Sequence, residues 1–141
     1  MGSPIVIDAS VILKWVLPPD REPHHAQAQA IAEAMAENRL SVAVPVLWYF
    51  EVGNILIRKY PDQAAEDLAD LRKHLLMFEQ AMTADWQSRI LDLTARYHVT
   101  FYDAAYHALA IVNDGIFVTA DENYLQAVAG EPNAIHLKDF R

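Results

Sequence analysis

The sequence predicts an α/β domain with a three-layer α/β/α arrangement around a mainly parallel central sheet. Short, continuous apolar runs such as "IVI", "VAV" and "IFV" are typical of strands buried on both faces. Longer helical segments separate these runs, and strands that alternate with helices indicate a parallel sheet covered on both sides. The 141 residues, 53% of them hydrophobic and with only four glycines, fit a single domain over residues 1–141.

The first part of the chain is expected to contain two strands and two helices. "PIVIDAS" is the first strand, and Ser10 is placed to cap a helix through "VILKWVL" that ends at Pro18 and Pro19. The alanine-rich "HHAQAQAIAEAMAEN" favours a second helix. "LSVAVP" is the second strand, which is broken at Pro45.

The rest of the chain is expected to be mainly helical. A helix from Val46 to Tyr60 is followed by one that begins at Pro61, a residue suited to a first helical turn. "TADWQSRILDLTARYH" has apolar residues at spacings of three and four, and "FYDAAYHALAIVND" is helical up to a C-cap at Gly115. "IFVTA" is a third strand, "DENYLQAVA" a short helix and "AIHLKD" a last strand.

The formal net charge of −8 limits how the chain can bind a polyanion. Proteins that hold nucleic acid by bulk electrostatics are usually basic, so divalent cations or a basic partner segment would have to act locally. No apolar stretch has a membrane-spanning length and no signal-peptide pattern opens the chain, so we expect a cytoplasmic protein. The absence of cysteine excludes disulfides and thiolate sites.

Four acidic residues lie in unusually apolar surroundings: Asp8, Glu51, Asp103 and Asp121. Asp8 directly follows "IVI" and Asp121 follows "IFVTA". Because the carboxyl ends of parallel strands meet at one edge of a sheet, where ligands bind, both side chains are expected there.

Helix capping is the structural alternative for three of these acids. Asp8 and Asp121 can each cap the helix that follows. Thr100 and Asp103 have the spacing of a capping box, and Thr119 and Glu122 repeat it.

Glu51 fits a surface position least well. Its helical neighbours in "VLWYFEVGNILI" are mostly apolar, so no rotation of the helix gives it a wide polar face. Asn54 lies one turn further on, so the two side chains can project into one polar pocket. An ion pair between Glu51 and Arg58 is the alternative.

Converging carboxylates favour a site for a hard divalent cation. Carboxylates that meet at one edge raise one another's pKa, which destabilises the fold unless a cation compensates. Mg²⁺ and Mn²⁺ take oxygen ligands, and such a site suits phosphodiester hydrolysis. A bound cation would hold Asp8 in its ionised form.

The motifs "VIDASVILKW", "PVLWYFEVGNIL", "TFYDAAYHALA" and "FVTADENYLQA", in this order, resemble those of PIN-domain nucleases, in particular the VapC-type toxins of toxin-antitoxin pairs. The resemblance implies an α/β/α sheet and a Mg²⁺- or Mn²⁺-dependent endoribonuclease that inhibits translation. The implied metal-binding acidic quartet is Asp8, Glu51, Asp103 and Asp121, accompanied by Ser10 and Asn54.

The same resemblance also implies partners. These are an RNA substrate, a second copy of the chain in a homodimer, and a cognate antitoxin that inserts a basic side chain into the acidic site. Asn123 stands where another carboxylate is found in some members, which leaves one or two metal ions open.

Other polar residues are weaker candidates. His107 lies four residues after Asp103, but hard cations prefer oxygen ligands. The pair His24–His25 is expected on the surface, and "WYF" at 48–50 mainly in the core, with part of it free for a dimer or antitoxin groove. Contacts to phosphate are conceivable for three residues, although a solvated face is the simpler interpretation of each: Lys14, Arg58 and Lys59.

Three other functions compete with this hypothesis. An RNase H-like nuclease also begins with an acid on a buried strand, but it needs early antiparallel hairpins. A phosphoacceptor role for Asp8 lacks the second acid of a D-x-D motif, because Ala9 and Ser10 follow. A non-catalytic module with an acidic pocket is the third, and the four intact acids argue against it.

Overall fold

The computed structural model describes residues 2–141 and contains a five-stranded sheet in the order β3-β2-β1-β4-β5. Every neighbouring pair of strands is parallel. The strands are β1 (Ile5–Ile7), β2 (Val42–Pro45), β3 (Glu79–Gln80), β4 (Ile116–Thr119) and β5 (Ala134–His136). The predicted α/β fold with a parallel central sheet is therefore confirmed.

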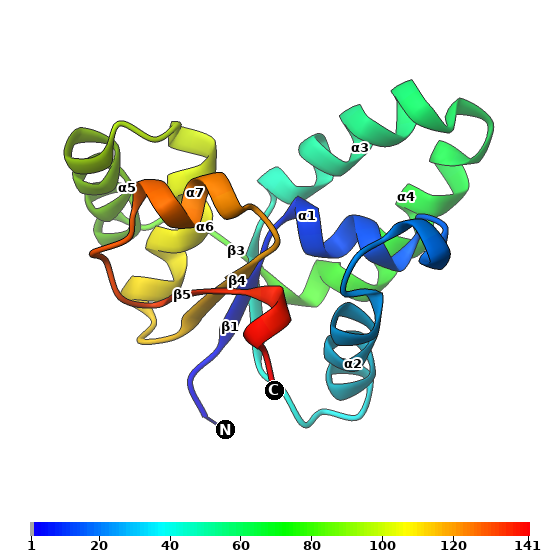
Figure 1. Cartoon of the computed structure of the whole chain (residues 1–141), viewed down its shortest axis with the longest axis horizontal. Coiled ribbons are helices and arrows are strands. Elements are labelled where there is room, and N and C mark those ends of the chain that lie inside the picture. Colours follow the sequence, from blue (N-terminus) through cyan, green and yellow to red (C-terminus); the bar gives the residue numbers. More distant parts are fainter. Residues whose placement is uncertain (1) are drawn as a thin grey trace.

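Helices cover both faces of this sheet (Figure 1). One side carries α1 (Ala9–Ile12), α2 (His25–Ala36), α3 (Leu47–Lys59) and α4 (Pro61–Leu75). The other carries α5 (Ala84–Tyr97), α6 (Phe101–Val112) and α7 (Glu122–Ala127). Short 3₁₀ turns occur at Leu13–Trp15, Pro19–Arg21, Leu76–Phe78 and Leu137–Asp139. Within residues 2–141 no helix has both the length and the apolar character needed to cross a bilayer.

The order of the strands reverses at β1 and β4. The chain runs outward from β1 to β2 and β3, and then returns to the other side of β1 for β4 and β5. Ile7 and Val118 are register partners, so the residues after β1 and β4 emerge at the same place. The beginnings of α1, α3 and α7 surround this point in Figure 1. In open α/β sheets ligands bind at such a switch point.

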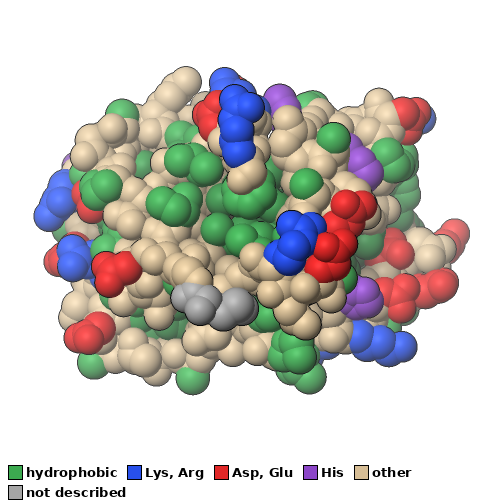
Figure 2. Space-filling model, turned by 90° about the horizontal axis from the view of Figure 1, so that it is seen from below, with side chains coloured by type: hydrophobic (Ala, Val, Ile, Leu, Met, Phe, Trp, Pro, Cys, Tyr) green, Lys and Arg blue, Asp and Glu red, His purple; other side chains and the backbone are tan. Residues whose placement is uncertain are grey.

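The opposite end of the molecule, seen in Figure 2, carries a mixed surface. Acidic and basic side chains are interspersed there among apolar ones. On the described part of that face no continuous basic patch is visible.

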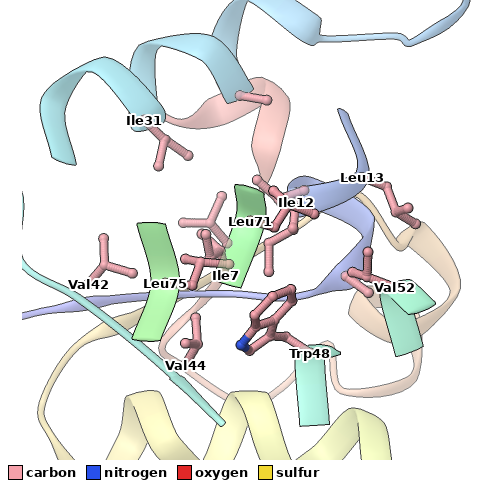
Figure 3. Close-up of a cluster of buried hydrophobic side chains, with 14 of the residues drawn as sticks. Ile7, Ile12, Leu13, Ile31, Val42, Val44, Trp48, Val52, Leu71 and Leu75 are labelled. Atoms are coloured by element: carbon pink, nitrogen blue, oxygen red, sulfur yellow. The ribbon is translucent and has the colours of Figure 1, made fainter. Parts of the chain in front are cut away.

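Alternate residues of the inner strands face opposite layers of helices. Ile5 and Ile7 belong to the core under α1 to α4, whereas Val6 belongs to the core under α5 to α7. Figure 3 shows the first core, with Ile7, Trp48 and Leu75 in one cluster. Because both faces of β1 are buried, its apolar run in the sequence is continuous rather than alternating.

The C-terminus of α6 differs from the prediction. Asn113 is the C-cap, and Asp114 takes the left-handed conformation, with a φ of 52°. Gly115 is required for space instead, since a Cβ at this position would lie 2.1 Å from the carbonyl oxygen of Pro4.

Strand β3 was not predicted, because Glu79–Gln80 contains no apolar run. It pairs with the end of β2, and Trp48 Nε1 donates a hydrogen bond to Glu79 Oε2 at 2.8 Å. Contacts with distant residues therefore define this strand, and the local sequence does not.

Candidate active site

Asp8 lies between the end of β1 and the start of α1, where it is the N-cap. Its Oδ1 accepts hydrogen bonds from Ser10 Oγ at 2.5 Å and from the Val11 N–H at 3.4 Å. Its Oδ2 accepts from Thr119 Oγ1 at 2.6 Å. The expectation that Ser10 caps the helix is wrong, because Ser10 lies inside α1 and its hydroxyl is directed at Asp8.

Two hydroxyl groups connect Asp8 to the segment after β4. Ser10 Oγ accepts from the Ala120 N–H, and Thr119 Oγ1 accepts from the Asp121 N–H, both at 3.0 Å. Since these backbone groups donate to the hydroxyl oxygens, each hydroxyl proton is free to point to Asp8. Thr119 therefore orients Asp8, and the capping box predicted for Thr119 and Glu122 is wrong. The sequence signal for Thr119 is a hydroxyl at the end of a buried strand, two residues before Asp121.

Glu51, in the second turn of α3, is half-buried and accepts a hydrogen bond from the Tyr106 hydroxyl at its Oε1, at 2.6 Å. This contact replaces the ion pair with Arg58 that we considered, and Arg58 is exposed. Glu51 and Asn54 line the same hollow, as their spacing predicts. Tyr106 was missed as a site residue, although it lies one turn after Asp103 on α6.

Asp103 and Asp121 both lie at helix N-termini. The Asp103 N–H donates to Thr100 Oγ1 at 3.0 Å, so the first half of the predicted capping box is present. Asp121 is the N-cap of α7, where its Oδ1 accepts from the Tyr124 N–H at 3.0 Å. Asp121 therefore combines a capping role with a place at the end of β4, whereas the helix end at Asp103 is capped by Thr100.

Three of the four carboxylates have a raised pKa, and in each of them the charge of another carboxylate contributes. Burial, together with the charge of Glu51, raises the pKa of Asp8 to about 6 despite its hydrogen bonds. Burial and the charge of Asp103 raise the pKa of Glu51. Burial and the charge of Asp121 raise the pKa of Asp103. Within residues 2–141, none of these four acids forms an ion pair with a lysine, arginine or histidine.

The donor set fits a hard divalent cation such as Mg²⁺ or Mn²⁺. In the described part of the chain, no three His, Cys, Asp or Glu side chains are grouped closely enough to hold one ion together. Mg²⁺ does not need such a trio, because it commonly binds through one or two carboxylates and keeps several water molecules. Carboxylate oxygens are the ligands that Mg²⁺ and Mn²⁺ prefer. Within the described residues, the carboxylates here lack a basic partner that would compete with such a cation.

His107 is buried and has a structural role. Its Nε2 lies 2.9 Å from the Pro132 carbonyl oxygen, and its Nδ1 lies 2.7 Å from the Tyr124 hydroxyl. Because the carbonyl only accepts, Nε2 carries the proton and Nδ1 accepts from Tyr124. Burial also lowers the pKa of His107, so both ring nitrogens are engaged in the neutral form.

Two surface predictions are wrong. Lys14 is buried, and its Nζ pairs with Glu22 Oε1 at 3.3 Å, so it does not face a phosphate. His24 and His25 are half-buried, and the ring of His24 packs edge-on against His136. Asn123, which stands where some members of the family have a further carboxylate, is exposed.

Comparisons with known proteins agree with this architecture. A family model described as PIN domain matches residues 5–131. A crystal structure of PAE2754 from Pyrobaculum aerophilum has a TM-score of 0.67 and 22% identity, over 98% of this chain and 93% of that chain. A toxin-antitoxin complex from Klebsiella pneumoniae has a TM-score of 0.67 and 18% identity, over 94% of this chain and 97% of that chain. At these identities the likeness shows the fold. Curated protein sequences give no match.

The raised pKa of Asp8 predicts a specific pH dependence of stability. In the unfolded chain the pKa of Asp8 has its ordinary value of 3.8, whereas in the folded chain it is about 6. Metal-free protein should therefore lose stability as the pH rises from about 4 to about 6, at up to about 1.4 kcal/mol per pH unit from this residue. Asp8→Asn removes this loss, so its free energy of unfolding relative to wild type should increase across the same window.

Urea unfolding in EDTA at several pH values measures this difference. Asp92→Asn, at an exposed position of α5, is the matched control and should follow wild type. A constant difference between Asp8→Asn and wild type from pH 4 to pH 7 would contradict the prediction, whatever its sign.

Proposed function

The chain belongs to the PIN domain family, and from this premise we propose that it is a Mg²⁺- or Mn²⁺-dependent endoribonuclease. The observation that supports this most strongly is the group of carboxylates at the switch point of the sheet. Burial and a neighbouring carboxylate raise the pKa of Asp8, Glu51 and Asp103, and none of the four acids has a countercharge within residues 2–141. A cation bound at such a site can neutralise the charge of a phosphodiester that lies beside it.

The chain's own side chains have distinct tasks in this proposal. The candidate cation ligands are Asp8, Glu51, Asp103 and Asp121, and an ion would bind through one or two of them while it keeps several water molecules. Ser10 and Thr119 hold the two oxygens of Asp8 in place, and Tyr106 holds one oxygen of Glu51. When bound, the cation would lower the pKa of the attacking water and neutralise charge on the phosphoryl group.

Asn54 completes the proposed site. It is exposed and shares a hollow with Glu51, so its amide can donate a hydrogen bond to a phosphate oxygen that reaches the carboxylates. An amide adds a donor without adding charge, which suits a position beside acids that already repel one another.

The competing interpretations receive less support. An RNase H-like nuclease was expected to show early antiparallel hairpins, but all five strands here are parallel. A phosphoacceptor site still lacks the second acid of a D-x-D motif, because Ala9 and Ser10 follow Asp8.

We further propose that the chain acts as the toxin of a toxin-antitoxin pair. A toxin-antitoxin complex shares its fold at a TM-score of 0.67. A basic side chain of an antitoxin would neutralise the acidic edge in the way a cation does, which is favourable for a chain of net charge −8. A homodimer stays a prediction from the family resemblance, and a cytoplasmic location stays a prediction from the sequence pattern.

The nuclease proposal predicts metal-dependent cleavage of RNA. Wild type should cleave members of a panel of structured RNAs in Mg²⁺ or Mn²⁺ and should not cleave them in excess EDTA. Asp8→Asn and Glu51→Gln should each reduce the rate by more than the roughly 10- to 100-fold typical of outer-shell residues, because a ligand itself is lost. Gel analysis of end-labelled RNA measures the rates.

Asp92→Asn serves again as the control and should keep wild-type activity, since this residue lies on the exposed side of α5. Cleavage that persists in excess chelator would refute the metal-dependent mechanism.

The partner proposal predicts that the product of an adjacent gene co-purifies with this chain. The partner should carry an arginine or lysine near the acidic site, and its co-expression should relieve the growth inhibition that the chain causes alone. Asp8→Asn should abolish growth inhibition and still bind the partner through the rest of its surface. Harmless expression of wild type, with no co-purifying protein, would refute the toxin proposal.

A further inference from the structure

Two exposed aromatic side chains flank the acidic site. Phe50 on α3 is 65% exposed and Tyr102 on α6 is 61% exposed. Both line the hollow that contains Glu51 and Asn54. Large aromatic side chains normally gain from burial, so their exposure beside polar site residues points to contact with a ligand.

A second hollow continues this surface. It shares Leu47 and Tyr102 with the first hollow and extends over Val46, Met82 and Phe101. These last three side chains are 48%, 52% and 47% exposed, respectively. We call the large apolar side chains that are exposed in the two hollows the aromatic surface: Val46, Phe50, Met82, Phe101 and Tyr102.

The aromatic surface has no basic residue to bind phosphates. Neither hollow is lined by lysine or arginine, and the chain carries a net charge of −8. Single-stranded nucleic acid can instead be held by its bases, which stack on aromatic rings regardless of sequence. Stacking needs no charge on the protein.

We propose that the aromatic surface binds unpaired nucleobases of RNA, with Phe50 and Tyr102 as the stacking residues next to the phosphate at Glu51. This inference rests on the proposed function in taking RNA as the ligand, and it adds the side chains that hold the bases and the physical basis of that binding. Neutral bases lie on the apolar surface, while the charged backbone faces the edge of the sheet where a cation is favoured. Paired bases in a duplex do not expose the faces that stacking needs.

A second copy of the chain is a less favourable occupant of this surface. Two copies packed here would bring two sets of the same four carboxylates toward each other, in chains that each carry a net charge of −8. Nucleobases bring no charge to the aromatic rings, so RNA is the better match.

Fluorescence anisotropy with a labelled single-stranded oligoadenylate tests the proposal in Ca²⁺, with gels to verify that the RNA stays intact. Phe50→Ala and Tyr102→Ala should each weaken binding between about 5-fold and about 100-fold, the range for loss of one stacked base. Phe50→Trp should retain the affinity, whereas Phe50→Leu, which keeps the apolar contact but loses the π face, should not. Leu91→Ala is the control, because Leu91 is 50% exposed on α5 and lines neither hollow.

The outcomes separate this inference from the nuclease proposal. Affinity that depends on Phe50 and Tyr102 in a protein that cleaves no RNA would support the aromatic surface and refute the nuclease. Metal-dependent cleavage with unchanged affinities in both alanine variants would refute the aromatic surface alone, and a wild type that does not bind the oligoadenylate would also overturn it. If light scattering shows that Phe50→Ala turns a dimer into a monomer and the affinity for RNA is unchanged, the surface is an interface between copies and the inference is wrong.

Discussion

The half-buried carboxylate of Asp8 is the constraint on which the rest of the site depends. The most interior strand of the sheet ends at this residue, at the point where the strand order reverses. Burial and the nearby charge of Glu51 raise its pKa to about 6, so the ionised form is less favourable in the folded protein than in water. A fold that keeps such a group without a basic partner in residues 2–141 favours the binding of a cation at this edge.

The same contacts serve stability and the site. Asp8 caps α1, and Asp121 caps α7, so each carboxylate satisfies backbone N–H groups that would otherwise lack partners. Ser10 and Thr119 then join these two helix ends across β1 and β4. The carboxylates are therefore held by the structural framework itself, and a bound cation would meet side chains that are already oriented.

The sequence predicts the parts of this arrangement that are local. A continuous apolar run that ends in Asp8 indicates a central strand and a buried acid, and the spacing of Glu51 and Asn54 places both on one side of α3. Tyr106 could not be assigned to Glu51, because the two residues are 55 positions apart and a tyrosine in an apolar helix is usually a core residue. Thr119 lies 111 positions from Asp8, and its local pattern fitted a capping box better. Lys14 was misplaced for a different reason, because the turn after Pro18 brings Glu22, eight positions further on, back against it.

The central claim is that a divalent cation compensates the buried charge of Asp8, and the protons released on metal binding test it most directly. Titration calorimetry of Mn²⁺ into metal-free protein, in buffers of different ionisation enthalpy, counts these protons. With a pKa of about 6, Asp8 should release roughly half a proton at pH 6 and almost none at pH 8, where Mn²⁺ should also bind more tightly. Mn²⁺ that binds equally tightly at both pH values without proton release, or does not bind, would contradict the account.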